Sequence, residues 1–139
     1  MKYLSFLLIF LVVQPACAIK AIPRTNAPKN AKVYFISPTD GATVKSPVLI
    51  QFGLSGMGVA PAGINKPETG HHHLLIDSKI KDYGFPIASD AQHIHFGLGQ
   101  TEALIHLKPG HHTLQLVLGD HIHVPHNPPV ISKPITIIV

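Results

Sequence analysis

The chain has little cysteine, no tryptophan and few charged residues. Of its 139 residues only one is cysteine, none is tryptophan, and charged residues make up 13%. The single cysteine, Cys17, lies close to the N-terminus. A disulfide framework and a thiolate-rich metal site are therefore excluded.

Positive charge is also sparse. The formal charge of +4 comes from 11 Lys and Arg against seven Asp and Glu, and the lysines are scattered along the chain. Without a basic run or tryptophan, the composition disfavours nucleic-acid binding.

The sequence signatures of common enzymes are missing or incomplete. The segment Gly53–Met57 lacks the second glycine of a G-x-S-x-G elbow, and Gly97–Gly99 lacks the third glycine of a dinucleotide-binding loop. No H-E-x-x-H occurs, and no paired carboxylates suggest glycoside hydrolysis. We therefore expect no enzymatic activity.

The first 18 residues have the features of a secretory signal peptide. Lys2 precedes the apolar run 4–13, and Ala16-Cys17-Ala18 is a small-x-small cleavage site. The apolar run is too short for a membrane span, which needs about 20 residues. A retained anchor or a lipoprotein signal ending at Cys17 is less well supported. We expect a periplasmic or secreted protein whose mature chain begins at Ile19 and carries no membrane span.

Residues 19–30 are polar and contain two prolines, which predicts a flexible leader before a single domain at 31–139. Within the domain, short β-branched or alternating apolar runs are separated by glycine and proline. The 13 prolines favour loops and edge strands over helices. We predict an all-β fold, a single immunoglobulin-like antiparallel β-sandwich of about seven strands, with a small β-barrel as the alternative. The predicted strands are 32–36, 48–54, 71–76, 93–96, 103–107, 112–118 and 134–139.

Histidine is the most unusual feature of the composition. The chain has 11 histidines, and all of them lie between His71 and His126. Three groups stand out: residues 71–73, residues 93 and 95, and residues 121, 123 and 126.

Two of these groups contain His-x-His within a predicted strand. Because side chains alternate along a strand, His71 and His73 leave one face together, as do His93 and His95. Two such imidazoles can bind one metal ion at about 2.0–2.1 Å from each nitrogen. The loop histidines His121 and His123 could complete a site begun on strands.

These patterns predict a histidine-rich metal site. The predicted metal ligands are His71, His73, His93, His95, His121 and His123. Three further residues are predicted to support these ligands from beside the site: His126, Asp120 and Glu102. Six ligands are too many for one tetrahedral zinc ion, so either a subset binds or two ions share the cluster.

Neutral imidazole favours Cu(II) or Zn(II), and copper binds more tightly in the Irving–Williams order. We therefore expect an exported carrier, buffer or sensor of copper or zinc. The exported protein could also bind an envelope protein as a partner. The alternative is an envelope interaction module without metal, whose histidines order loops or bind a protein or glycan.

Several long segments resemble a bacterial secreted family known only as a domain of unknown function. They are GMGVAPAG (56–63), TGHHHLLID (69–77), HFGLGQTEA (95–103) and PGHHTLQLVLGDHIHVPHNPPV (109–130). The resemblance covers about residues 31–139 and implies export and a β-rich fold without implying an activity.

A looser similarity links the chain to periplasmic copper-resistance proteins with an immunoglobulin-like sandwich. The turn Ser37–Gly41 and the segment Leu107–Thr113 carry it. The chain lacks the N-terminal histidine ligand of those proteins. The similarity therefore implies the scaffold and not the metal site.

Overall fold

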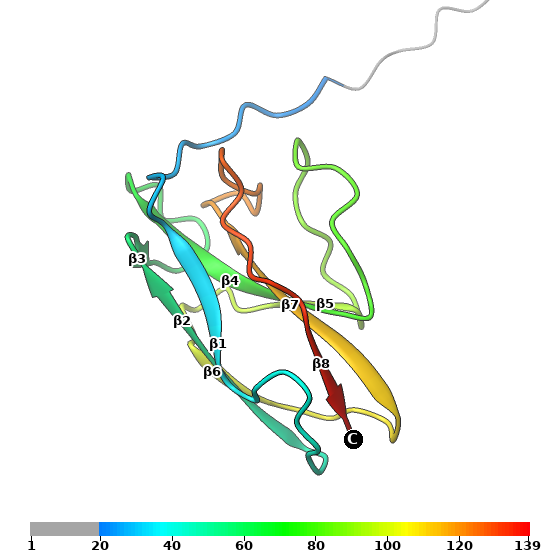
Figure 1. Ribbon diagram of the computed structural model, residues 1–139. Helices are drawn as coiled ribbons and strands as arrows, with labels where there is room; N and C mark the ends of the chain where they lie inside the picture. The colour runs from blue at the N-terminus through cyan, green and yellow to red at the C-terminus, as the bar shows by residue number, and fades with distance from the viewer. Residues whose placement is uncertain (1–19) are drawn as a thin grey trace, which may run out of the picture.

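The computed structural model describes residues 20–139, which form two facing β-sheets (Figure 1). One sheet has three strands in the order β1-β2-β6, and the other has β3-β4-β7-β8 with β5 paired to β4. The strands are β1 (Lys32–Ser37), β2 (Val48–Ser55), β3 (Gly58–Val59), β4 (Thr69–Ile76), β5 (His93–His95), β6 (Glu102–Ile105), β7 (His111–Gly119) and β8 (Ile135–Ile138).

The predicted all-β sandwich is confirmed, and each of the seven predicted strands is present with slightly different ends. The short strand β3 falls in a segment predicted to be a loop, and it runs parallel to β4. The larger sheet is therefore mixed rather than wholly antiparallel. The immunoglobulin-like topology stays a prediction. No helix among the described residues is long and apolar enough to cross a bilayer.

The main core lies between the two sheets. Alternate residues of β2 (Val48, Ile50 and Phe52) face it from one side. Leu114 and Leu116 of β7, both fully buried, face it from the other. Burying a large aliphatic or aromatic side chain stabilises the fold by about 1.5–3 kcal/mol, so these residues dominate its stability.

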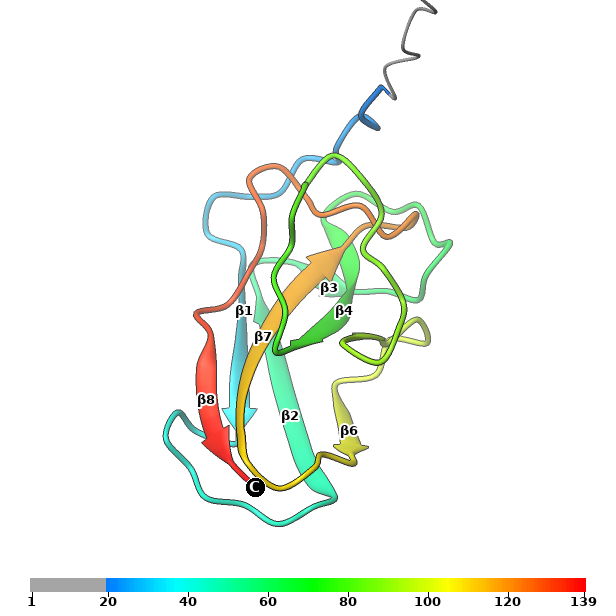
Figure 2. The ribbon, with the colours of Figure 1, turned by 90° about the vertical axis from the view of Figure 1, so that its right-hand side faces the viewer.

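The outer face of the larger sheet is also covered. There Leu75, Ile87 and Val117 form a second buried cluster, against which Ile80 and Ile131 pack. The β4–β5 loop and the chain after β7 cross this face (Figure 2). Strand β4 is consequently buried on both faces from Gly70 to Ile76, which gives the site its enclosed setting.

The described part of the predicted leader, residues 20–30, is hydrogen-bonded to the domain. The Ile22 amide donates to the Gly84 carbonyl at 2.9 Å, and the Ala27 amide donates to the Asn127 carbonyl at 2.9 Å. Arg24 donates to the carbonyl oxygens of Pro125 and His126. This segment therefore follows the β7–β8 connection. The predicted signal peptide lies outside the described residues.

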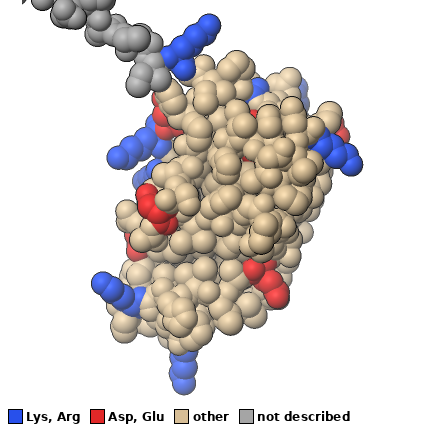
Figure 3. Space-filling model, turned by 180° about the vertical axis from the view of Figure 1, so that it is seen from behind, with Lys and Arg blue, Asp and Glu red and all other residues tan. Residues whose placement is uncertain are grey.

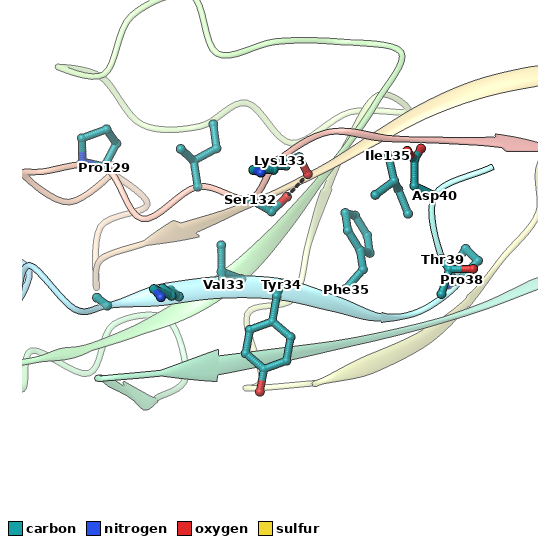
Figure 4. Close-up of a pocket in the computed structure, with 13 residues that line it drawn as sticks. Val33, Tyr34, Phe35, Pro38, Thr39, Asp40, Pro129, Ser132, Lys133 and Ile135 are labelled. Carbon is teal, nitrogen blue, oxygen red and sulfur yellow. Dashed lines mark hydrogen bonds between the residues drawn. The ribbon is translucent and has the colours of Figure 1, made fainter. Parts of the chain in front are cut away.

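A groove with a volume of about 600 Å³ opens where β1 faces residues 129–135. Val33 and Phe35 point from β1 toward the facing segment 129–135, Phe35 toward Ile135, whereas Tyr34 points away (Figure 4). No histidine lines this groove. On the face seen from behind, charged side chains stand singly and form no cluster of one sign (Figure 3).

Candidate metal centre

Four histidines from three parts of the chain gather on the outer face of the larger sheet. His71 and His73 come from β4, His95 from β5 and His123 from the β7–β8 connection. The ring centroids of His95 and His123 lie 4.7 Å apart, and those of His71 and His73 lie 4.9 Å apart. One possible ligand atom from each of His71, His95 and His123 lies within 4.8 Å of the other two. These residues could hold a metal ion.

Strand register places three of the four rings. His71 and His73 share a face of β4 because side chains alternate along a strand, and His72 points to the main core instead. His95 pairs with His73 across the antiparallel β4–β5 ladder, which puts their ring centroids 5.1 Å apart. The β4–β5 pairing therefore builds most of the cluster.

A tight turn held by Asp120 brings the fourth ring. The Asp120 carbonyl accepts a hydrogen bond from the His123 amide at 2.9 Å, and His123 has a φ of 71°. One oxygen of the Asp120 carboxylate accepts hydrogen bonds from the amides of Ile122 and Val124, each at 3.0 Å. The other accepts a hydrogen bond from the Thr25 hydroxyl at 2.6 Å. Asp120 therefore fixes the loop that presents His123.

Burial keeps these imidazoles neutral. Burial, and then the neighbouring His123 and His95, lower the pKa of His71 from 6.5 to about 4, against the opposing charge of Asp120. Burial and the neighbouring histidines lower the pKa of His73 to about 2. The pKa of His95 is lowered by the same two effects. Neutral imidazole is the form that binds a metal ion, so protons compete little for these nitrogens.

Several buried ring nitrogens of the cluster have no hydrogen-bond partner among the described residues. They are Nδ1 of His71, Nδ1 of His73 and Nε2 of His95. The Nε2 atoms of His71 and His73 lie 3.0 Å from each other. Leaving a buried polar atom unpaired costs about 1–3 kcal/mol, and nitrogen ligation by a bound ion would offset part of this cost within the cluster. The donor set therefore fits a metal ion.

Three glycines make room for the rings. A Cβ atom at Gly97 would lie 2.2 Å from Cε1 of His95, and one at Gly119 would lie 2.9 Å from Nε2 of His73. A Cβ atom at Gly70 would lie 2.9 Å from Cε1 of His126. Larger residues at these positions would displace the imidazoles.

Of the six predicted ligands, the structure brings together His71, His73, His95 and His123, while His93 and His121 lie outside the cluster. His93 lies two residues from His95 along β5, opposite Leu75. Its Nδ1 contacts Asp90 at 2.7 Å and its Nε2 contacts Ser78 at 2.9 Å, so both nitrogens are already used. Residues 121 and 123 lie in a turn, where the two-residue alternation of a strand does not apply.

The three residues predicted to support the site have different positions. Asp120 shapes the His123 turn. His126 is buried beside the site with its ring nitrogens near the carbonyl oxygens of Leu118 and Thr69, at 3.4 and 3.2 Å. Glu102 is exposed on β6 in the other sheet, where it accepts a hydrogen bond from Gln51 at 2.9 Å. The structure does not bring Glu102 to the histidines.

The structural role of the glycines was not predicted from the sequence. Gly97 follows His95 by two residues and Gly119 ends β7 just before Asp120, so each adjoins a histidine group. A glycine within or just after a strand often marks close approach of another group, and this signal could have identified both positions.

Comparison with known proteins identifies a family whose description names no activity. A family model described as Domain of unknown function (DUF4399) matches residues 50–139, which is more than half of the chain and includes every histidine. No curated protein and no solved structure matches the chain. The similarity to copper-resistance proteins stays a prediction. The chain therefore belongs to the DUF4399 family of domains of unknown function.

Proposed function

We propose that the protein is an exported metal-binding protein that holds Cu(II) or Zn(II) at His71, His95 and His123, with His73 as a fourth ligand. The observation that carries the proposal is the convergence of three possible ligand atoms within 4.8 Å. Export is inferred from the predicted signal peptide. We assign this metal site no catalytic role, and metal binding alone fits a carrier, buffer or sensor.

The donor set supports copper or zinc. All four groups are imidazoles, and within the described part of the chain, residues 20–139, no thiolate or carboxylate belongs to the cluster. Magnesium and calcium favour oxygen ligands, and Cu(I) favours sulfur. Four imidazoles can complete a tetrahedral zinc site, and copper would bind such nitrogens more tightly at equal availability.

The burial of the ligands supports reversible exchange of the ion. His71 and His73 are fully buried, whereas His95 and His123 are only partly buried. The first pair would hold the ion from a rigid central strand. The second pair would give it a route to solvent, which a carrier or buffer needs.

Metal content tests the proposal. The chain from residue 19 to 139 is dialysed against Zn(II) or Cu(II), then against metal-free buffer, and bound metal is measured by mass spectrometry. We expect about one ion per chain, and a loss of more than tenfold in affinity in the double variant H95Q/H123Q. The matched control, H106Q, changes an exposed histidine outside the cluster and should retain the ion. Absence of retained metal in the folded wild-type chain would refute the proposal.

A further inference from the structure

A second cluster of polar side chains lies beside the end of β4, apart from the four-histidine cluster. The Ser78 hydroxyl lies 2.9 Å from Nε2 of His93, and Nδ1 of His93 lies 2.7 Å from the Asp90 carboxylate. The three residues are separated in the sequence, and the β4–β5 pairing with its loop brings them together.

The hydrogen bonds define the tautomer of His93. The carboxylate of Asp90 can only accept, so the proton of a neutral His93 lies on Nδ1. Nε2 then carries a lone pair and accepts the hydrogen bond from the Ser78 hydroxyl. The Asp90 oxygen also accepts a hydrogen bond from the Gln92 amide at 2.8 Å, which holds the carboxylate in place. This order of donor and acceptor is the one that activates a serine nucleophile.

A cavity of about 510 Å³ adjoins these groups and is lined by Ser78, His93 and Asp90. Ile80, Phe85 and Ile87 give it an apolar wall, and Lys79 lies next to the serine. Its volume is within the range of about 300–1,000 Å³ for small-molecule sites. A short acyl chain could lie against the apolar wall with its carbonyl carbon at Ser78.

The chain bends sharply at the nucleophile. Asp77, the first residue after β4, has a φ of 52°, so Ser78 leaves the direction of the strand. Lys79 and Ile80, the two residues after Ser78, line the cavity, where their backbone amides could stabilise negative charge on a substrate oxygen.

We propose that Ser78, His93 and Asp90 form a second site that hydrolyses small carboxylic esters with a short apolar acyl group. Ser78 Oγ attacks the ester carbonyl carbon while its proton passes to Nε2 of His93. The bond from that carbon to the alcohol oxygen breaks, and the alcohol leaves with the proton. Water then attacks the acyl-serine through the same base, which releases the carboxylic acid and restores the Ser78 hydroxyl. Asp90 is a positioning residue that orients the imidazole.

The expectation of no enzymatic activity rests on the absence of contiguous sequence motifs. Ser78 is followed by Lys79 and Ile80 rather than by the glycine of an elbow motif. The proposed site is formed by residues whose proximity depends on the fold, and sequence spacing alone gives no signal for it.

Covalent labelling tests the proposal. The whole purified chain is incubated with a fluorophosphonate probe and, separately, with p-nitrophenyl acetate, both with EDTA present so that metal-bound water does not contribute. We expect a probe adduct on the peptide that contains Ser78. Ester hydrolysis should fall about 100-fold or more in S78A and in H93Q.

The matched control is S55A, which changes an exposed serine at the end of β2 and should retain both labelling and hydrolysis. Thermal unfolding of S78A confirms that the variant is folded. The absence of a Ser78 adduct in the wild-type chain, or an equal hydrolysis rate in folded S78A, would overturn the proposal. Because EDTA is present throughout, neither result bears on metal binding by the four-histidine cluster.

Discussion

His71 and His73 present their Nε2 atoms to each other at 3.0 Å on the outer face of β4. Two nitrogens bound to one tetrahedral zinc ion lie about 3.3 Å apart, given bond lengths of about 2.0 Å. The separation of these two nitrogens is therefore close to that of a pair bound to one ion. An ion bound by both nitrogens would replace the contact between the rings.

The affinity for zinc should depend only weakly on pH in the mildly acidic range. Burial lowers the pKa of His71 to about 4 and that of His73 to about 2, so both stay neutral at pH 6. We expect affinity to fall less than about tenfold between pH 7.5 and 6, measured by competition with a chromophoric chelator. A site built from three exposed histidines with a pKa near 6.5 would lose roughly 50-fold in zinc affinity over the same pH range. Such a loss would contradict the account.

The glycines beside the rings should be essential for metal affinity. In G119A the added methyl group would contact His73, and in G97A it would contact His95. We expect each variant to bind zinc at least about tenfold more weakly in isothermal titration calorimetry. The control is G58A, where the new Cβ atom would lie 3.5 Å from its nearest neighbour, an ordinary contact. Equal affinity in all three variants would argue against the ring positions described above.

Asp120 should control affinity through the His123 turn. In D120A the amides of Ile122 and Val124 lose their acceptor, and the turn loosens. We expect a loss of about 10- to 100-fold in zinc affinity. The control is D40A, which removes the carboxylate that accepts a hydrogen bond from the Thr136 amide. D40A should lower stability without weakening metal binding, and the same affinity loss in both variants would contradict a specific role for Asp120.

His72 should make the metal-free protein less stable in acid. It lies in the main core against Phe52, with ring centroids 4.7 Å apart, and burial lowers its pKa from 6.5 to about 4. Between these values the unfolded chain binds the proton more readily, so the free energy of unfolding falls as the pH falls below about 6.5. For His72 this amounts to about 2 kcal/mol between pH 7.5 and 5.

Urea unfolding of the wild type and H72L at pH 7.5 and pH 5 measures this contribution. We expect the loss of stability at pH 5 to be smaller in H72L by about 2 kcal/mol. The same loss in both proteins would show that His72 does not titrate in this way.

His112 should have the opposite effect. Its Nε2 lies 2.8 Å from the Lys108 carbonyl and its Nδ1 lies 2.7 Å from the Asp77 carboxylate. The hydrogen bonds to Lys108 and then to Asp77 raise its pKa above 6.5. Its stabilising effect is therefore complete below pH 6.5 and is lost as the pH rises through the raised pKa.

Unfolding of H112Q against the wild type should show a stability difference at pH 6 that shrinks at pH 8.5. H111Q, which changes the exposed neighbouring histidine, is the control. A difference that stays constant with pH would contradict this assignment.

Strand patterns allowed much of the fold and part of the site to be predicted from the sequence. The alternation in residues 71–76 and 93–96 placed His71 and His73 on one face and put His95 on the face away from Ile94. It could not show that His93 is held by Ser78 and Asp90, because those contacts depend on how the β4–β5 loop folds back. It also could not separate His121 from His123, because the turn at Asp120 determines which ring enters the cluster.

The most direct test of the account is a crystal structure of the zinc-loaded protein with anomalous diffraction at the zinc edge. We predict one strong anomalous peak among His71, His95 and His123, about 2.0–2.1 Å from a nitrogen of each ring. His73 should provide the fourth nitrogen. Zinc located only at exposed histidines such as His106 or His111, with the four-histidine cluster unchanged and empty, would contradict the central claim.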